Sequence, residues 1–235
     1  MEDIRFLTAF KFYHNEPRRV TWVARAVRES QGLVVTVTLE SSRTLKTGSD
    51  EHILHFSGKV ILKWHETEVQ EANAKVPEWN GNYTVKAEDI YRLYFHGPAF
   101  QVLEGVQRSG TGLIGKMNRN LPSILSTEHT LLSTPTLVEL CFQTAGIWEI
   151  GKTGTMALPS SIECLTLHRQ SINGANIYAE VEPKTSKNGE LHFDARVVDS
   201  KGRLYLELED YRTTPMPDAV EPILLVPLQE LMRDS

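Results

Sequence analysis

Short runs of β-branched residues, interrupted by glycines, dominate the first 62 positions of the chain. The runs at 21–27, 33–40 and 53–62 show partial alternation of apolar and polar side chains, and Gly32, Gly48 and Gly58 punctuate them. Alternation with a period of two is typical of β-strands, and glycines favour the turns that separate them. The pattern predicts a meander of strands at the start of the chain.

Further strand patterns fill the second part of the chain. Turn-forming sequences, Lys187-Asn188-Gly189 and Ser200-Lys201-Gly202, separate the last three of them. The predicted strands lie at 102–108, 112–117, 161–167, 175–182, 190–199 and 203–211.

Two stretches break this pattern. Between 64 and 83 the alternation stops, and acidic residues, Pro77, Gly81 and three asparagines accumulate. This composition is typical of a solvated connection, so we predict a linker at 67–85 between residues 1–66 and residues 86–216. The last stretch, 217–235, continues a proline-rich segment. We expect it to be an extended tail that docks back on the body of the protein.

One segment has the pattern of a helix. Residues 136–150 follow Thr134, which can serve as N-cap, and Pro135, whose missing N–H costs nothing in a first helical turn. Apolar residues occupy all sides of this helix, which is typical of a helix buried on every side. A single buried helix among strands suggests a sheet wrapped around it, so the predicted fold class is α+β.

Glu139 and Gln143 are the strongly polar residues in the middle of that helix. Four residues apart, they share one face and should meet. A carboxyl group among apolar side chains favours its protonated form, which suits a general acid. The alternative is a core polar pair in which Gln143 and backbone donors satisfy Glu139.

Composition excludes several classes of function. The 235 residues contain 25 Lys and Arg against 30 Asp and Glu, a net charge of −5, so there is no basic excess for binding nucleic acid. No apolar run approaches the roughly 20 residues that span a membrane, and the acidic start is unlike a signal peptide. We expect a cytoplasmic protein that binds neither nucleic acid nor membrane.

Nothing in the sequence indicates a metal or a cofactor. Cys141 and Cys164 have apolar neighbours and no metal-ligand spacing, which indicates reduced core thiols. The eight histidines show no ligand spacing either. A G-x-S-x-G elbow is absent from the sequence, and Gly151-Lys152-Thr153 lacks the preceding strand of a P-loop.

Three motifs carry a resemblance to a known family. The stretch from Tyr94 to Gln101 (YFHGPAFQ) resembles the Y-G-P-x-F-Q signature of polyketide synthase and polyunsaturated fatty acid synthase dehydratase domains. Pro135-x-x-x-Glu139-x-x-x-Gln143 resembles their P-x-x-x-D-x-x-x-Q helix, and the segment 158–162 (LPSSI) resembles a strand entry of the same half. The resemblance covers about residues 86–216. It differs at Glu139, where Asp is usual, at Thr134, where His often precedes the proline, and at His96, where Tyr precedes Gly-Pro.

This resemblance implies a double hotdog fold, in which each antiparallel sheet wraps a central helix. Residues 86–216 would form a complete C-terminal hotdog, and residues 1–66 a partial N-terminal one. The H-x-x-x-G-x-x-x-x-P motif that carries the family's catalytic His does not occur in this sequence. The resemblance makes Glu139 the acid and Gln143 the residue that orients it. It places the substrate-binding residues at His96, Gly97, Pro98, Phe100, Thr134 and Pro135.

The function implied is a dehydratase for β-hydroxyacyl thioesters on an acyl carrier protein, in polyketide or fatty acid biosynthesis, incomplete without a His-bearing N-terminal segment. Two alternatives stay open: a non-catalytic acyl-binding hotdog module and a hotdog acyl-thioesterase. Exposed strand edges and an uncovered apolar face would favour a homodimer or a partner domain of a synthase.

Overall fold

The strands of this protein form one continuous antiparallel sheet. The computed structural model describes residues 1–12, 17–44, 48, 50–64, 73–122, 134–169, 175–186 and 190–233. In these ranges the sheet has 11 strands in the order β2-β3-β4-β1-β8-β11-β10-β9-β7-β6-β5. The strands are β1 (Glu2–Phe6), β2 (Thr21–Glu29), β3 (Gly32–Thr44), β4 (Asp50–Lys63), β5 (Val85–Lys86), β6 (Leu103–Ser109), β7 (Gly112–Met117), β8 (Thr155–Leu167), β9 (Ile177–Thr185), β10 (Leu191–Asp199) and β11 (Leu204–Ala219). Each predicted strand is confirmed, most with longer ends.

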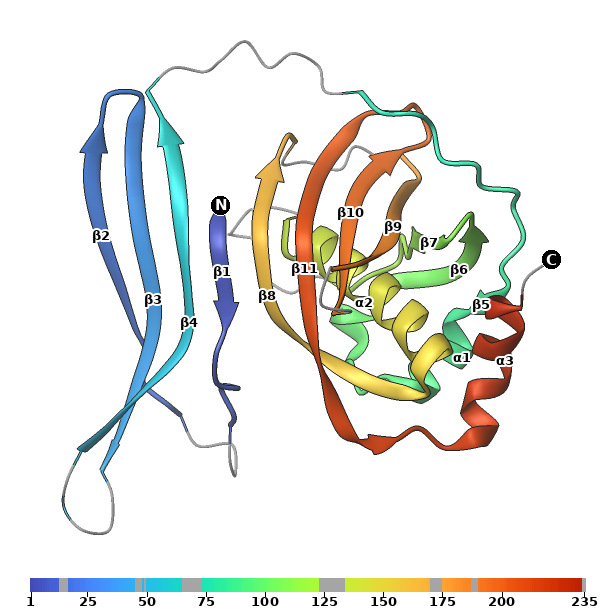
Figure 1. Cartoon of the computed structure of the whole chain (residues 1–235), viewed down its shortest axis with the longest axis horizontal. Helices are drawn as coiled ribbons and strands as arrows, with labels where there is room; N and C mark the ends of the chain where they lie inside the picture. The colour runs from blue at the N-terminus through green and yellow to red at the C-terminus, as the bar shows by residue number, and fades with distance from the viewer. Residues whose placement is uncertain are drawn as a thin grey trace.

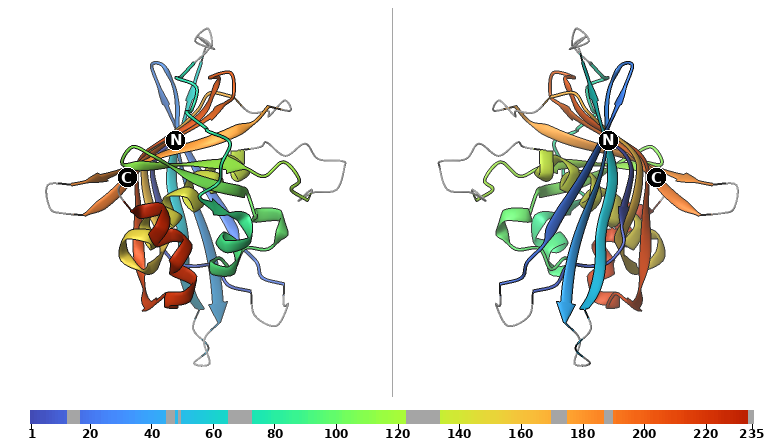
Figure 2. Two further views of the ribbon diagram at one scale, coloured as in Figure 1. Left: turned by 90° about the vertical axis from the view of Figure 1, so that its right-hand side faces the viewer. Right: turned by 90° about the vertical axis from the view of Figure 1, so that its left-hand side faces the viewer.

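The first four strands and the last seven meet at a single pairing. Strand β1 pairs with β8, with Ile4 opposite Ile162, and also with β4 on its other side. The amino terminus of Met1 donates to the carbonyl of Leu165 at 2.7 Å, which fixes the start of β1 at this junction. The sheet twists strongly from one end to the other (Figure 2), as antiparallel sheets do.

The helices gather on one half of the sheet. They are α1 (Ala87–Leu93), the short 3₁₀ helix η1 (Pro98–Phe100), α2 (Thr134–Thr153) and α3 (Pro222–Met232). Figure 1 shows α1, α2 and α3 beside strands β5–β11, and none of them over β2–β4.

Helix α2 is the central helix that the sequence predicts at 136–150, extended at both ends. Leu137, Leu140, Ala145 and Ile147 are fully buried among the strands of this half. Its approach to β7 depends on a glycine, because a Cβ at Gly115 would lie 2.1 Å from the Thr144 hydroxyl of α2. The sheet therefore wraps closely around α2.

The prediction of an extended tail at 217–235 is wrong for its second part. Helix α3 begins at Pro222, where a proline fits the first turn, and it contains Pro227. Leu228, Leu231 and Met232 lie on one face of α3 and are buried, and Met232 packs against Gly151 of α2. Burial of this face outweighs the hydrogen bond that Pro227 removes, which the proline count alone did not reveal.

The described part of the predicted linker begins beside the β10–β11 turn. The amide of Ala74 donates to the carbonyl of Gly202 at 2.8 Å. Gly202 has a φ of +77°, and a Cβ there would lie 2.5 Å from the Ala74 carbonyl, so both the turn and the approach require glycine. No helix within the described ranges is long and apolar enough to cross a membrane.

Candidate active site

Helix α2 brings Glu139 and Gln143 into direct contact. The amide nitrogen Nε2 of Gln143 donates to Oε1 of Glu139 at 2.8 Å. Gln143 is buried, whereas 19% of the Glu139 side chain is exposed. The contact expected from their spacing is confirmed, and it leaves the carboxyl group accessible at the surface of α2.

The orientation of the Gln143 amide follows from its other partners. Its Nε2 also donates to the carbonyl of Phe100 at 2.7 Å, and its Oε1 accepts from the Tyr91 hydroxyl at 2.8 Å. The Tyr91 oxygen in turn accepts the amide of Leu103 at 2.7 Å, so its own hydrogen is free to donate. If the amide were flipped, its oxygen would face the Phe100 carbonyl oxygen, and neither atom could donate a hydrogen. Gln143 therefore presents N–H, not C=O, to Glu139.

A second tyrosine fixes the backbone of α2 at the same level. The Tyr94 hydroxyl donates to the carbonyl of Gln143 at 3.0 Å. Gly146 makes room for it, because a Cβ there would lie 2.4 Å from the hydroxyl oxygen. Burial raises the pKa of both Tyr91 and Tyr94, with a smaller contribution from the charge of Glu139. Both phenols stay protonated and act as donors across the physiological range.

His96 reaches the same carboxyl oxygen from the loop after α1. Its Nε2 lies 3.0 Å from Oε1 of Glu139, with 22% of the His96 side chain exposed. The loop is held by the Gln101 side-chain amide, which donates to the His96 carbonyl at 3.1 Å. The Phe95 ring stacks on the imidazole with centroids 5.2 Å apart, and the Tyr94 ring meets it edge-on.

The other predicted site residues lie in the loop after α1 and at the start of α2. Gly97 and Pro98 are exposed and lead into η1, and Phe100 contributes its backbone carbonyl. Thr134 is the first residue of α2, and the exposed Pro135 follows it, one turn before Glu139. His14, His65 and His129 lie outside the described residues. Among the described ones, no group of three or more His, Cys, Asp or Glu side chains is placed to hold a metal ion.

The site borders the N-terminal strands. Phe142 lies on the same face of α2 as Glu139, three residues on. Its ring stacks on Tyr211 with centroids 4.5 Å apart and meets the edge of Phe6 of β1 at 6.0 Å. The carboxyl group therefore lies where the two halves of the sheet join.

Comparison with known families agrees with this arrangement. A sequence model described as the polyketide synthase dehydratase N-terminal domain matches residues 84–222. The chain belongs to the polyketide synthase dehydratase family. No curated protein matches it.

Solved dehydratase structures share the fold. The dehydratase domain from the CurF module of curacin polyketide synthase superposes with a TM-score of 0.70 at 20% identity, covering 92% of this chain and 75% of that one. A trans-AT polyketide synthase dehydratase domain from Brevibacillus brevis gives 0.67 at 16% identity, with 92% and 75% covered. Two variants of the CurK dehydratase give 0.66 at 18% identity, covering 92% of this chain and 76% and 74% of theirs.

The hotdog prediction is therefore confirmed for this dehydratase. Strands β5–β11 surround α2, and β1–β4 continue the same antiparallel sheet. The sequence did not single out Tyr91, which lies in α1, a helix that its pattern did not predict. Tyr94 lies within the YFHGPAFQ motif, but the sequence analysis assigned no role to it. The apolar neighbours of both tyrosines in the sequence were the only indication that these residues could be buried.

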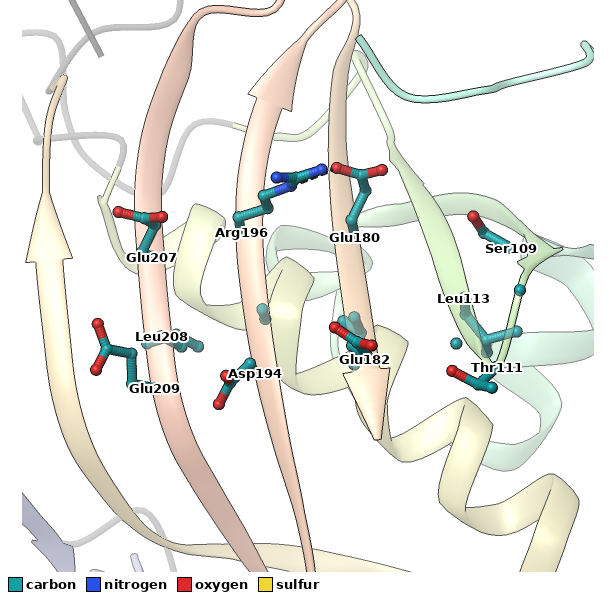
Figure 3. Close-up of a pocket in the computed structure, with 14 residues that line it drawn as sticks. Ser109, Thr111, Leu113, Glu180, Glu182, Asp194, Arg196, Glu207, Leu208 and Glu209 are labelled. Carbon is teal, nitrogen blue, oxygen red and sulfur yellow. Dashed lines mark hydrogen bonds and ion pairs between the residues drawn. The ribbon is translucent and has the colours of Figure 1, made fainter. Parts of the chain in front are cut away.

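A separate pocket of about 510 Å³ lies on the opposite surface of the sheet. Figure 3 shows Glu182, Asp194 and Glu209 projecting from β9, β10 and β11, with Arg196 directed at Glu180. Arg196 and Glu180 form an ion pair at 2.6 Å. The alternate residues of these strands, such as Val181 and Leu208, are buried on the side of α2. This pocket does not include Glu139.

Proposed function

We propose that this family member dehydrates β-hydroxyacyl thioesters carried by an acyl carrier protein, with Glu139 as the general acid and Gln143 orienting it. The observation that carries the proposal is the asymmetry of the Glu139 carboxyl group. Gln143 and His96 both contact Oε1. In the described part of the chain nothing is hydrogen-bonded to Oε2. That oxygen is available to a substrate.

The reaction needs two positioned groups. A base removes a proton from the α carbon, the electron pair of that C–H bond forms the new double bond, and the β hydroxyl leaves. Protonation of the departing oxygen by the carboxyl group of Glu139 releases it as water. The products are an α,β-unsaturated thioester and the Glu139 carboxylate, which regains its proton from the base or from solvent.

A histidine from a segment outside these 235 residues is proposed as the base. Two CurK dehydratase variants, one with a histidine replaced by phenylalanine and one with an aspartate replaced by asparagine, are described as inactive. The resemblance in sequence matches Glu139 to the family's acidic residue, whereas the family's histidine motif does not occur here.

The N-terminal strands offer a surface for that segment. Direct pairing across β2, β3 and β4 aligns most of their apolar side chains on one side of the sheet, whereas Val27, Val34 and Ile61 are in register on the other side. Phe6 shares the first of these sides, and its contact with Phe142 places α2 on the same side. Trp22 is 61% exposed, and Leu62 is 50% exposed. We call this surface the apolar face; it comprises Ile4, Phe6, Trp22, Ala24, Ala26, Leu33, Val35, Val37, Leu39, Phe56, Val60 and Leu62.

The dimensions of the apolar face suit one helix. From Leu33 to Leu39, strand β3 extends roughly 20 Å at about 3.4 Å per residue. A helix of that length has about 14 residues at 1.5 Å each. A helix that covers the apolar face lies next to Phe6 and so approaches Phe142 and Glu139. This is where the base would have to come from.

The decisive experiment measures dehydration with and without a His-bearing segment. Purified chain is incubated with a β-hydroxyacyl thioester of pantetheine, alone and with the segment fused or added, and the unsaturated thioester is quantified. We expect weak turnover alone and a rise on the order of 10²–10⁴ with the segment, the usual contribution of a general base. Glu139→Gln should abolish that rise. Glu149→Gln, on the same helix, is the matched control and should preserve it.

Two results would contradict this function. Release of free thiol without an unsaturated product would indicate a thioesterase. Binding of the thioester that is equal in Glu139→Gln and wild type, with no turnover under any condition, would indicate a non-catalytic acyl-binding module.

A further inference from the structure

Aromatic side chains form a continuous row that leads away from the candidate site. The row begins at Phe142 of α2, three residues from Glu139 on the same face of the helix. The ring of Phe6 meets Phe142 edge-on at 6.0 Å, and the Phe56 ring meets Phe6 at 5.6 Å. The Trp22 ring follows at 6.2 Å from Phe56. We call Phe142, Phe6, Phe56 and Trp22 the aromatic row.

The ring contacts are closed in one direction and open in the other. Beyond Phe142 they continue to Tyr211 and Phe193, which are 2% and 0% exposed. In the other direction Phe6 is 37% exposed and Trp22 is 61% exposed. Figure 1 shows none of the described helices over β2–β4. The open part of the row therefore starts beside the candidate acid and runs towards β2.

The aromatic row differs from the rest of the apolar face. The three aromatic side chains of that face all belong to the row, whereas its other members are aliphatic and include the small residues Ala24 and Ala26. Contiguous exposed apolar side chains indicate a ligand-binding groove or an interface. Ligand sites in proteins are lined by aromatic and apolar side chains with a few polar groups at one place. The row together with Glu139 has this composition.

We propose that the aromatic row binds the acyl chain of the substrate, with the hydroxyl-bearing carbon at Glu139 and the far end of the chain towards Trp22. The proposal rests on the function proposed above and adds the class of substrate, a β-hydroxyacyl thioester with a long apolar chain. The helix of the His-bearing segment would lie over the chain and enclose it against the row.

Two directions lead away from the hydroxyl-bearing carbon of such a substrate. One leads to the thioester and its pantetheine arm, which contains polar amide groups, and the other follows the apolar chain. The loop after α1 suits the arm, because the backbone of Gly97 is exposed and an added Cβ there would meet no atom within 4 Å. The aromatic row suits the chain, because apolar surface gains free energy when other apolar surface covers it.

The first test measures binding to the 235-residue chain. Pantetheine thioesters of β-hydroxybutyrate and β-hydroxytetradecanoate are compared by titration calorimetry. We expect the longer one to bind at least about 10-fold tighter, because each methylene group that becomes covered contributes up to about fourfold in affinity.

Two tryptophans provide a matched pair of variants for this test. Trp22→Ala removes the far end of the row and should weaken binding of the longer thioester by about 10-fold. Trp64 is 44% exposed and lies outside the row, with Arg28 over its ring. Trp64→Ala should bind both thioesters like wild type. Both side chains are exposed, so we expect neither change to prevent folding.

The second test uses turnover by the chain fused to the His-bearing segment, with thioesters of increasing length. Phe6 lies nearer to Glu139 than Trp22 does along the row. We therefore expect Phe6→Ala to raise KM about 10-fold for both β-hydroxyoctanoyl and β-hydroxytetradecanoyl pantetheine. Trp22→Ala should raise KM to this extent for the longer substrate alone, with kcat within about threefold of wild type.

The outcomes separate this inference from the proposed function. Equal binding of the short and long thioesters, or equal losses in Trp22→Ala and Trp64→Ala, would overturn the inference. A preference for long chains that disappears in the fused protein would overturn it as well, because the side chains of the segment would then fill the row. If Glu139→Gln retains full turnover, the proposed function fails instead, and the binding measurements still decide whether the row takes an acyl chain.

Discussion

The hydroxyl of Tyr91 and the side-chain oxygen of Gln143 lie 2.8 Å apart, 52 residues from each other in sequence. This hydrogen bond links helix α1 to helix α2. It also completes a chain of donors that begins at the Leu103 amide and ends at the Glu139 carboxyl group. The orientation of the candidate acid therefore depends on a tyrosine that never touches it.

Replacement of Tyr91 by phenylalanine tests this chain. The change removes one oxygen and leaves both the Gln143 oxygen and the Leu103 amide without a partner. We expect the free energy of unfolding to fall by about 1–3 kcal/mol, measured by urea denaturation. Dehydration by the completed protein should also fall, because Gln143 becomes free to turn away from Glu139. A loss of stability with full activity would show that this hydrogen bond stabilises the fold but is not needed for the orientation of Glu139.

A lysine on the apolar face should block binding of the His-bearing segment. Val37 lies on this face, and its neighbour Thr36 points to the other side of β3. Val37→Lys places a charge in an apolar contact, which is costly, so we expect binding to be lost. Thr36→Lys, the matched control, should bind like wild type. Titration calorimetry measures both, and Trp22 fluorescence should shift to the blue on binding. Equal binding by the two variants would contradict a docking site here.

Glu149 should make the protein less stable as the pH rises. It is buried on α2 and accepts hydrogen bonds from the Thr213 hydroxyl at 2.9 and 3.0 Å. Burial raises its pKa above the ordinary value of 4.5, and the Thr213 hydrogen bond offsets this only in part. The contribution of the neutral Glu149 carboxyl group to the free energy of unfolding is fully present below pH 4.5. It is lost as the pH rises through the raised pKa of the folded protein.

Glu149→Gln should remove this dependence. We expect the variant to be more stable than wild type at pH 7–8, and the difference to shrink towards zero below about pH 4.5. Thermal unfolding from pH 4 to pH 8 measures both proteins. A variant that is less stable than wild type at every pH would show that the carboxylate is stabilised by its surroundings.

Two glycines should respond differently to alanine. At Gly115 the new methyl group would meet Thr144 and Leu103, both in the packed interior. We expect Gly115→Ala to lower the free energy of unfolding by about 1–3 kcal/mol, the usual cost of overpacking. At Gly97, with a φ of −68° and no atom within 4 Å of the new Cβ, the same change should leave stability nearly unchanged. Equal losses of stability in chemical denaturation would contradict this account.

Local chemistry was enough to predict much of this fold. Apart from the two-residue strand β5, the strands from β2 to β11 follow the alternation and turn residues of the sequence, and the all-round apolar pattern predicted the buried helix α2. These features depend on neighbouring positions, which interact at fixed distances in a strand or a helix. The contact of Glu139 with Gln143 belongs to the same class, because a spacing of four residues fixes it.

Other features were decided by contacts between distant segments. The prolines of α3 favoured an extended tail, and only packing of Leu228 and Leu231 against the body made that segment helical. The short helix α1 has no strong pattern of its own, and it forms where Ile90 is buried against the sheet.

The sequence by itself determined the two residues on α2 and their family. It did not determine that His96, Gln143 and Tyr91 lie together around Glu139, nor which side chains of β2, β3 and β4 share the apolar face. Local patterns specify elements one at a time, whereas hydrogen-bond partners and sheet register depend on how the chain brings distant elements together. These contacts are determined by the tertiary structure, because a buried polar group forms its hydrogen bond with a partner that folding brings close, wherever that partner lies in the sequence.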